Sequence, residues 1–338
     1  MKIQVNAVRK VGLAGALAMG LMGGFAQAQE DAAAQDAQLA TVRQGIPHDA
    51  IYDIEIMGKQ GLAVGAFGTI LQSEDSGESW KPMESGTQFA LLGIGVNGDR
   101  RIVVGQRGTV LLASADGKWE AGTSNSESRL MNVSVNASGL AVAVGEFGTV
   151  LRSKDGGQNW EKLTLDWMSF REDGYEPHLY TVNVDDNGRI VLGGEFSYVI
   201  VSEDGGDNWT LPYKGEKSIF SMFFMPDGSG YAVGQEGLVM KTPDMGNTWT
   251  TVEVGSNANL FGVWASKHGE VVITGQRALI RSSDGGNTWT PSTDVEIVRN
   301  WFQPIAVGES ASKAPGGEMV AQVIYVGGYM GKIARLMR

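Results

Sequence analysis

Six short acidic turns are the most regular chemical feature of this sequence. Five place an Asp two residues after a Ser or Thr and five residues before a Trp, and a shortened sixth copy has its Trp three residues after the Asp. These Asp/Trp turns contain Asp75 and Trp80, Asp116 and Trp119, Asp155 and Trp160, Asp204 and Trp209, Asp244 and Trp249, and Asp284 and Trp289. Because each turn has one such Asp and calcium takes about six to eight oxygen ligands, we expect no metal there. We expect structural turns, in which the carboxylate accepts backbone hydrogen bonds and the Trp packs on neighbouring strands.

Residues for nucleophilic or metal chemistry are few. The chain has no Cys, which excludes disulfides, thiolate ligands and a Cys nucleophile. The three histidines, His48, His178 and His268, are far apart in sequence. No G-x-S-x-G, Walker or H-E-x-x-H motif is present. We therefore predict no catalytic residue, no metal and no cofactor.

Two arginines leave one enzymatic alternative open. Arg107 and Arg277 occupy the same position of a repeated turn and could point toward a common centre, and Arg43 lies near the start of the repeats. A sialidase-like glycoside hydrolase would need three arginines that grip a carboxylate, a Tyr nucleophile with a nearby Glu, and an Asp acid. Because such a function must be argued from its site, it remains the alternative hypothesis.

The Asp/Trp turns belong to a repeat of about 40 residues. Successive Trp residues are separated by 39, 41, 49, 40 and 40 positions. Each unit opens with an apolar phrase such as Ile51–Ile54, and continues with a second phrase such as 143–151, AVGEFGTVL. These runs are short and rich in Val and Ile, which indicates strands. Four strands per repeat predict a propeller blade.

The last unit, 302–338, lacks an Asp/Trp turn. We expect its missing outer strand to come from Leu39 to Arg43, since closure of the ring protects strand edges. The predicted fold is therefore all-β: a seven-bladed β-propeller of four-stranded blades over 39–338, closed by an N-terminal strand. Within the last unit, the insertion 308–318 reads as a flexible loop on the face of the Asp/Trp turns.

The N-terminus has the features of an export signal. Residues 1–28 combine early basic residues, a 15-residue apolar run and the cleavage site Ala26-Gln27-Ala28. Residues 29–38 read as a flexible leader. We expect a periplasmic or otherwise exported protein that is soluble after signal cleavage and has no membrane span. The net charge of −11 disfavours nucleic acid as a partner.

The pattern A-V-G-x-x-G-T-[IV]-L-x-[ST]-x-D-G-G-x-x-W matches best at 143–160 and 232–249. It resembles the photosystem II stability/assembly factor family, and its acidic part resembles the Asp-box of bacterial neuraminidase repeats. The resemblance covers about 39–338 and implies a seven-bladed propeller from the non-photosynthetic bacterial branch. It also implies a non-catalytic scaffold or assembly factor whose partner is a membrane-protein complex met from the periplasmic side. Photosynthetic members carry an Arg-rich surface, whereas the arginines of this chain are scattered.

A candidate partner-binding face follows from the G-x-x-G turn between the second and third strands. We call the second x of each turn the tip residue; the tips are Phe67, Arg107, Phe147, Phe196, Glu236, Arg277 and Met330. Large apolar residues and Arg are typical of interfaces, whereas loop tips are usually small and polar. The alternative is that each aromatic tip covers its neighbouring blade. Tyr329 and, from the long connection 163–178, Trp167, Phe170 and Tyr175 complete the predicted face.

Overall fold

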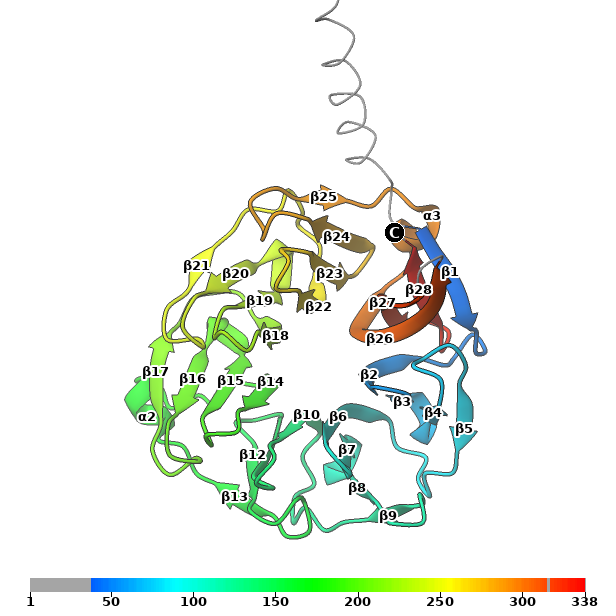
Figure 1. The fold of residues 1–338 in the computed structure, drawn as a ribbon. Coiled ribbons are helices and arrows are strands. Elements are labelled where there is room, and N and C mark those ends of the chain that lie inside the picture. The colour runs from blue at the N-terminus through cyan, green and yellow to red at the C-terminus, as the bar shows by residue number, and fades with distance from the viewer. Residues whose placement is uncertain (1–37, 315–316, 338) are drawn as a thin grey trace, which may run out of the picture. The chain divides into compact units, whose positions relative to one another are not determined.

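The computed structural model describes residues 38–314 and 317–337, which form seven antiparallel four-stranded sheets around a central axis (Figure 1). The predicted seven-bladed β-propeller is therefore confirmed. The first strand of each blade lies innermost: β2 (Ile51–Met57), β6 (Leu91–Asn97), β10 (Leu130–Val135), β14 (Leu179–Val184), β18 (Ile219–Phe224), β22 (Leu260–Ala265) and β26 (Phe302–Ala314). The predicted signal peptide 1–28 and residues 29–37 of the predicted leader lie outside the described residues.

The second and third strands form the body of each blade. The second strands are β3 (Gln60–Gly65), β7 (Arg100–Gly105), β11 (Ala141–Gly145), β15 (Ile190–Gly194), β19 (Gly230–Gly234), β23 (Val271–Gly275) and β27 (Gly317–Gly328). The third strands are β4 (Ile70–Ser73), β8 (Val110–Ala113), β12 (Val150–Ser153), β16 (Val199–Ser202), β20 (Val239–Thr242), β24 (Ala278–Ser282) and β28 (Ile333–Met337). All five residues of β11 are buried, because both faces of this strand pack against neighbouring blades. The propeller core therefore lies between the blades, as apolar side chains of adjacent sheets.

The outer strands are short and lie at the rim: β5 (Lys81–Met83), β9 (Trp119–Ala121), β13 (Glu161–Leu163), β17 (Thr210–Tyr213), β21 (Thr250–Thr251) and β25 (Thr290–Pro291). In the last blade β1 (Gln38–Arg43) takes this place. It pairs antiparallel with β28, from Gln38 opposite Met337 to Arg43 opposite Ile333. The buried Lys332 Nζ donates to Thr41 Oγ1 over 3.0 Å and pairs with Glu296 of helix α3 (Val295–Arg299), so charge also ties this edge together.

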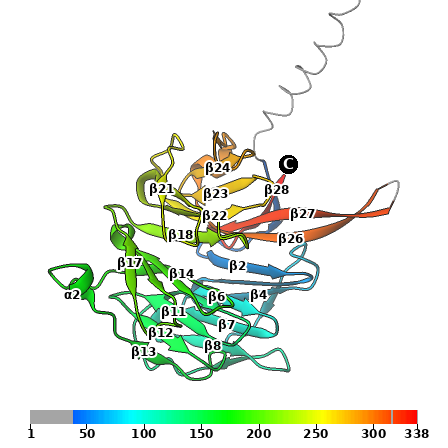
Figure 2. The same cartoon turned by 60° about the vertical axis from the view of Figure 1, so that its left-hand side comes forward.

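The prediction of a flexible loop at 308–318 is wrong for the described part of this insertion. The pairing of β26 with β27 continues through Gly308 opposite Val323 to Ala314 opposite Gly317. The two strands thus form a long hairpin that projects from the disc on the side away from helix α2 (Trp167–Phe170) (Figure 2). The physical reason is that continued pairing satisfies the backbone N–H and C=O groups that a loop would leave to water.

The Asp/Trp turns are local hydrogen-bond networks, as the turn at Asp155 shows. The Ser153 hydroxyl donates to Asp155 Oδ1 over 2.7 Å, and the Asn159 N–H donates to the same oxygen over 2.9 Å. These bonds and that of the Asn159 side chain lower the pKa of Asp155 to about 2. Trp160 Nε1 donates to the Gly157 carbonyl over 2.8 Å, and its ring packs among apolar residues of the preceding blade, including Ile102. The turn therefore seals one blade against the next.

Candidate partner-binding face and central channel

Every G-x-x-G turn, including the variant at Gln276, is bonded to the start of its own blade's inner strand. In all seven blades the N–H of the first x residue donates to the carbonyl of the residue just before the inner strand, over 2.8 to 3.3 Å. Ala66 thus bonds to Ala50 and Gln106 to Ala90. The turns therefore gather around one end of the central axis, on the face that also carries the connections between blades. We call this surface the candidate face.

The side chains of several first x residues form hydrogen bonds that hold the start of the inner strand. The side chains of Gln106, Glu146, Glu195 and Gln235 each accept the backbone N–H of the residue before the inner strand, over 2.9 to 3.2 Å. The acidic and amide residues at this position are thus fixed by the fold, since they cap a strand. The tip residues remain as the variable part of the turn.

All seven tip residues have a left-handed backbone, with φ between 50° and 59°. In most blades the tip and the following Gly are the central residues of a two-residue turn that Asn-Gly would fit best. A bulky residue in this region costs roughly 1–3 kcal/mol in strain. Phe67 and Phe147 occupy it and still expose 61% of their surface each, so neither is there to fill a core.

The other tips divide into exposed polar groups and half-buried ones. Arg107, Glu236 and Arg277 are exposed, whereas Phe196 and Met330 are half-buried. The Arg107 guanidinium lies over the Phe89 ring, 5.4 Å from its centroid. The alternative that every aromatic tip is covered by a neighbouring blade is therefore wrong for Phe67 and Phe147, and that these tips bind a partner remains a prediction.

The long connection 163–178 lies beside two of these tips, but Trp167 is not one of its exposed residues. Only 7% of Trp167 is exposed, since its ring joins the apolar cluster between the third and fourth blades and rests against the Gly148 turn. The prediction of Trp167 as a binding residue is wrong because it closes this core. Phe170 is half-buried against the same cluster, whereas Tyr175 is 42% exposed.

Sequence reasoning missed Arg171 in this connection. Its guanidinium lies 4.5 Å from the ring centroid of Phe196 and 5.6 Å from that of Tyr175. The two rings are in turn 5.7 Å apart in an edge-to-face contact, and Asp173 pairs with Arg171 over 2.7 Å. The loop thus carries a cation between two aromatic rings on the candidate face. The sequence shows an Arg in a polar loop, without indicating that folding brings it to Phe196.

Tyr329 belongs to the support of the last blade. Its hydroxyl donates to Glu296 over 2.7 Å, and its ring meets Phe302 edge-to-face at 5.6 Å. Burial and the neighbouring Glu296 raise the pKa of Tyr329. Tyr329 is half-buried and its hydroxyl is bonded to Glu296, so its role on the predicted face stays a prediction.

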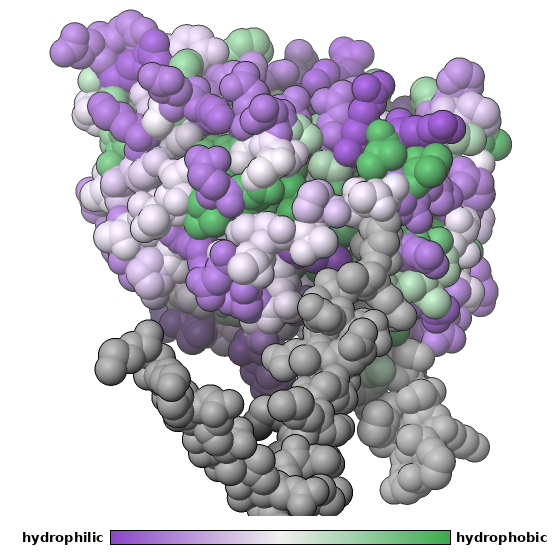
Figure 3. Space-filling model, turned by 90° about the horizontal axis from the view of Figure 1, so that it is seen from above, coloured by the Kyte–Doolittle hydropathy of each residue, from purple (hydrophilic) through white to green (hydrophobic). Residues whose placement is uncertain are grey.

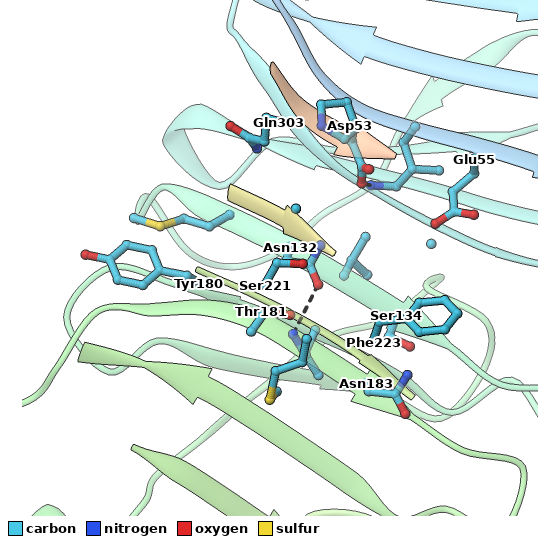
Figure 4. Close-up of a pocket in the computed structure, with 18 of the residues that line it drawn as sticks. Asp53, Glu55, Asn132, Ser134, Tyr180, Thr181, Asn183, Ser221, Phe223 and Gln303 are labelled. Carbon is cyan, nitrogen blue, oxygen red and sulfur yellow. Dashed lines mark hydrogen bonds between the residues drawn. The ribbon is translucent and has the colours of Figure 1, made fainter. Parts of the chain in front are cut away.

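The central channel is a second feature of this face, and sequence reasoning missed it as a site. The inner strands line a cavity of about 350 Å³ (Figure 4). The second residue of each opening phrase faces it near the candidate face, and six of these seven residues are apolar or aromatic: Tyr52, Leu92, Met131, Tyr180, Phe220 and Phe261. Four of them are aromatic, a regularity that a comparison of the opening phrases could have revealed.

Deeper in the channel two carboxyl groups come from one strand. Asp53 and Glu55 alternate along β2 and both line the cavity (Figure 4). Desolvation by the channel walls raises the pKa of Asp53, and the same effect together with the charge of Asp53 raises that of Glu55, although Glu55 keeps an exposed surface within the channel. No described arginine lines the channel, so the three-arginine grip of a sialidase-like site is not assembled there. Arg107 and Arg277 lie at the tips of G-x-x-G turns instead.

Other surfaces offer fewer features. Figure 3 shows apolar residues in small separate patches among hydrophilic ones. Within 38–314 and 317–337 no group of three or more His, Asp or Glu is placed to hold a metal ion. Across the same ranges no helix is long and apolar enough to cross a membrane.

Fold and site together define a β-propeller whose turn tips and channel mouth share one face. No family model matches the chain. The chain is 30% identical over 109 residues to the photosystem II stability/assembly factor HCF136 of the rice chloroplast, and the match spans 26% of that protein's length.

Solved structures match over most of the chain. A structure of YCF48 bound to D1 peptide has a TM-score of 0.67 at 20% identity and covers 90% of this chain and 98% of that one. YCF48 from Cyanidioschyzon merolae has a TM-score of 0.69 at 18% identity, over 89% and 98%. A GH74 xyloglucanase from Xanthomonas campestris has a TM-score of 0.65 at 15% identity, over 88% and 53%. The predicted resemblance is confirmed as a similarity: part of the chain resembles a photosystem II stability/assembly factor in sequence, and the chain shares its fold with the two YCF48 structures.

Proposed function

We propose that this chain is an exported, non-catalytic propeller that binds a protein partner on the candidate face and supports assembly or stability of a membrane-associated protein complex. The observation that carries the proposal is the exposure of Phe67 and Phe147 in strained left-handed turns. Exposed aromatic residues at loop tips are typical interface anchors. Asn or Gly would fit these left-handed turns with less strain, so we infer that the Phe rings serve a purpose outside the turn.

The neighbouring cation adds specificity to the proposed surface. Arg171 lies between Phe196 and Tyr175, and Arg107 lies over Phe89. Arginine held against aromatic rings offers both apolar area and hydrogen-bond donors to a partner carboxylate. The protein partner is in line with the relative solved with a D1 peptide.

Crosslinking capture from the native cell envelope tests the proposal. Wild-type protein should recover a membrane-protein complex, and a variant with both Phe67→Ala and Phe147→Ala should recover much less of it. Met57→Ala is the matched control, because Met57 is an exposed apolar residue at the far end of β2. Equal recovery by the double variant and the wild type, with the fold intact, would remove the candidate face from the account.

A further inference from the structure

The central channel contains two carboxyl groups, those of Asp53 and Glu55, which are separate from the candidate face. Asp53 is fixed by the backbone: its Oδ1 accepts the Ile54 N–H over 2.9 Å and its Oδ2 accepts the Ile94 N–H over 2.8 Å. Glu55, two residues on, has no hydrogen bond or ion pair with any described residue. Alternate residues of a strand point to one side about 7 Å apart, so both carboxyl groups face the same cavity.

No cation of the protein balances this charge. Among the described residues that line the channel there is no Lys, Arg or His. Arg101 of β7 borders a small neighbouring crevice together with Glu55, but no ion pair joins the two side chains. A solute that enters the channel therefore meets two carboxyl groups that have no counter-ion among the described lining residues.

The mouth of the channel suits hydrocarbon and cations. Tyr180 and Phe220 have ring centroids 5.3 Å apart, and Phe220 and Phe261 5.9 Å apart, so three blades contribute a continuous aromatic wall. Tyr52 lines the cavity from the blade that carries Asp53 and Glu55. Aromatic faces attract ammonium groups and also pack against alkyl chains.

We propose that the channel binds a primary alkylammonium group, with its charge at Asp53 and Glu55 and its hydrocarbon chain along the aromatic mouth. A β-bulge between Ile51 and Asp53 interrupts the alternation of β2, so Tyr52 lines the same cavity as Asp53 and Glu55. The cation can be a free amine or a Lys side chain of a partner, because both present the same chemistry. The inference goes beyond partner binding on the candidate face and does not rest on it.

Calorimetric titration of the folded chain with n-hexylammonium tests the inference, with n-hexanol and hexanoate as probes of equal length. Hexylammonium should bind about tenfold or more tightly than either control probe. Glu55→Gln keeps the shape, removes the charge, and should weaken hexylammonium binding about tenfold. Glu120→Gln is the matched control, since Glu120 is an exposed acid on β9. This variant should bind hexylammonium with the same affinity as the wild type.

Proton release gives a readout that a merely structural role of Glu55 would not move. The pKa of Glu55 is raised to about 8, so a cation that binds its ionised form is expected to release a proton at neutral pH. The groups that face Glu55 are Asp53, which opposes its ionisation, and Arg101 across the crevice. The affinity for hexylammonium should therefore increase as the pH rises from about 6 to 8, with proton release that depends on Glu55.

Three results would overturn the inference: no binding of hexylammonium, equal binding of hexanol, or unchanged affinity in a Glu55→Gln variant that melts like the wild type. Capture of the envelope partner by Glu55→Gln distinguishes the sources. Reduced capture identifies the cation as a Lys side chain of the partner, whereas unchanged capture identifies a free amine. Because hexylammonium binding is measured without any partner, failure of the candidate face would leave this test intact.

Discussion

Replacement of Trp160 by Ala, compared with replacement of Phe147 by Ala, separates the two kinds of aromatic residue in the repeats. Trp160 is 5% exposed, packs on the preceding blade and donates to the Gly157 carbonyl. Phe147 lies 13 residues earlier in the same blade, is 61% exposed and contacts the His178 ring at 4.9 Å. Each change removes an aromatic ring, one from a buried and one from an exposed position.

The magnitudes follow from these surroundings. Loss of a buried Trp costs about 3–5 kcal/mol of unfolding free energy, from the lost transfer term and the cavity left behind. A propeller of about 300 residues has an unfolding entropy near 0.6 kcal/mol/K, so Trp160→Ala should lower Tm by about 5–8 °C. Phe147→Ala should change stability by less than about 0.5 kcal/mol, since little buried area is lost.

Differential scanning calorimetry and partner capture on the same preparations give the comparison. We expect Trp160→Ala to lower Tm and to retain partner capture at temperatures where it is folded. We expect Phe147→Ala to leave Tm nearly unchanged and to weaken partner capture. The reasoning is refuted if Phe147→Ala lowers Tm as much as Trp160→Ala, because Phe147 would then support the fold.

Three further outcomes are expected. Phe147→Gly should raise the unfolding free energy by about 1 kcal/mol through relief of left-handed strain, and it should weaken partner capture. Urea unfolding measures the change in stability, and a lower stability would show that the fold needs the ring. Trp167→Ala should destabilise by about 3–5 kcal/mol, in the same assay, because it opens the core between the third and fourth blades. Asp155 has a pKa of about 2 in the folded chain, below the ordinary Asp value of about 3.9. Its contribution to the unfolding free energy is therefore complete above about pH 4 and is lost as the pH falls toward 2. Asp155→Asn should therefore reduce the slope of unfolding free energy against pH in this window, and an unchanged slope would show that the turn carboxylate is not linked to stability.

The repeat was sufficient to predict the blades, because its turns obey local chemistry. The Ser153–Asp155–Asn159 network needs only residues within one turn, so the sequence phrase and the structure agree. The insertion at 308–318 was misread since Gly and Ser resemble a loop, whereas pairing between β26 and β27 is decided by the partner strand. The composition of the insertion alone therefore cannot predict that pairing.

The candidate site was predictable only in part, for a related reason. Periodicity places the tips at one end of the blades, but exposure depends on what packs over each tip. Trp167 and Phe147 both looked like surface aromatics, and only the folded connection shows that Trp167 lies inside a core. The channel mouth arises from residues such as Tyr52 and Phe261, about 210 positions apart, which ring geometry brings to one cavity.

Site-specific photocrosslinking in intact cells tests the central claim most directly. A photoreactive phenylalanine analogue placed at Phe147, and separately at Phe67, should crosslink to the same protein partner, because both tips lie on the candidate face. The same analogue at Met57, at the far end of the inner strand, should give no such product. Crosslinking to that partner from Met57 with none from either tip would contradict the account and place the binding surface on the opposite face.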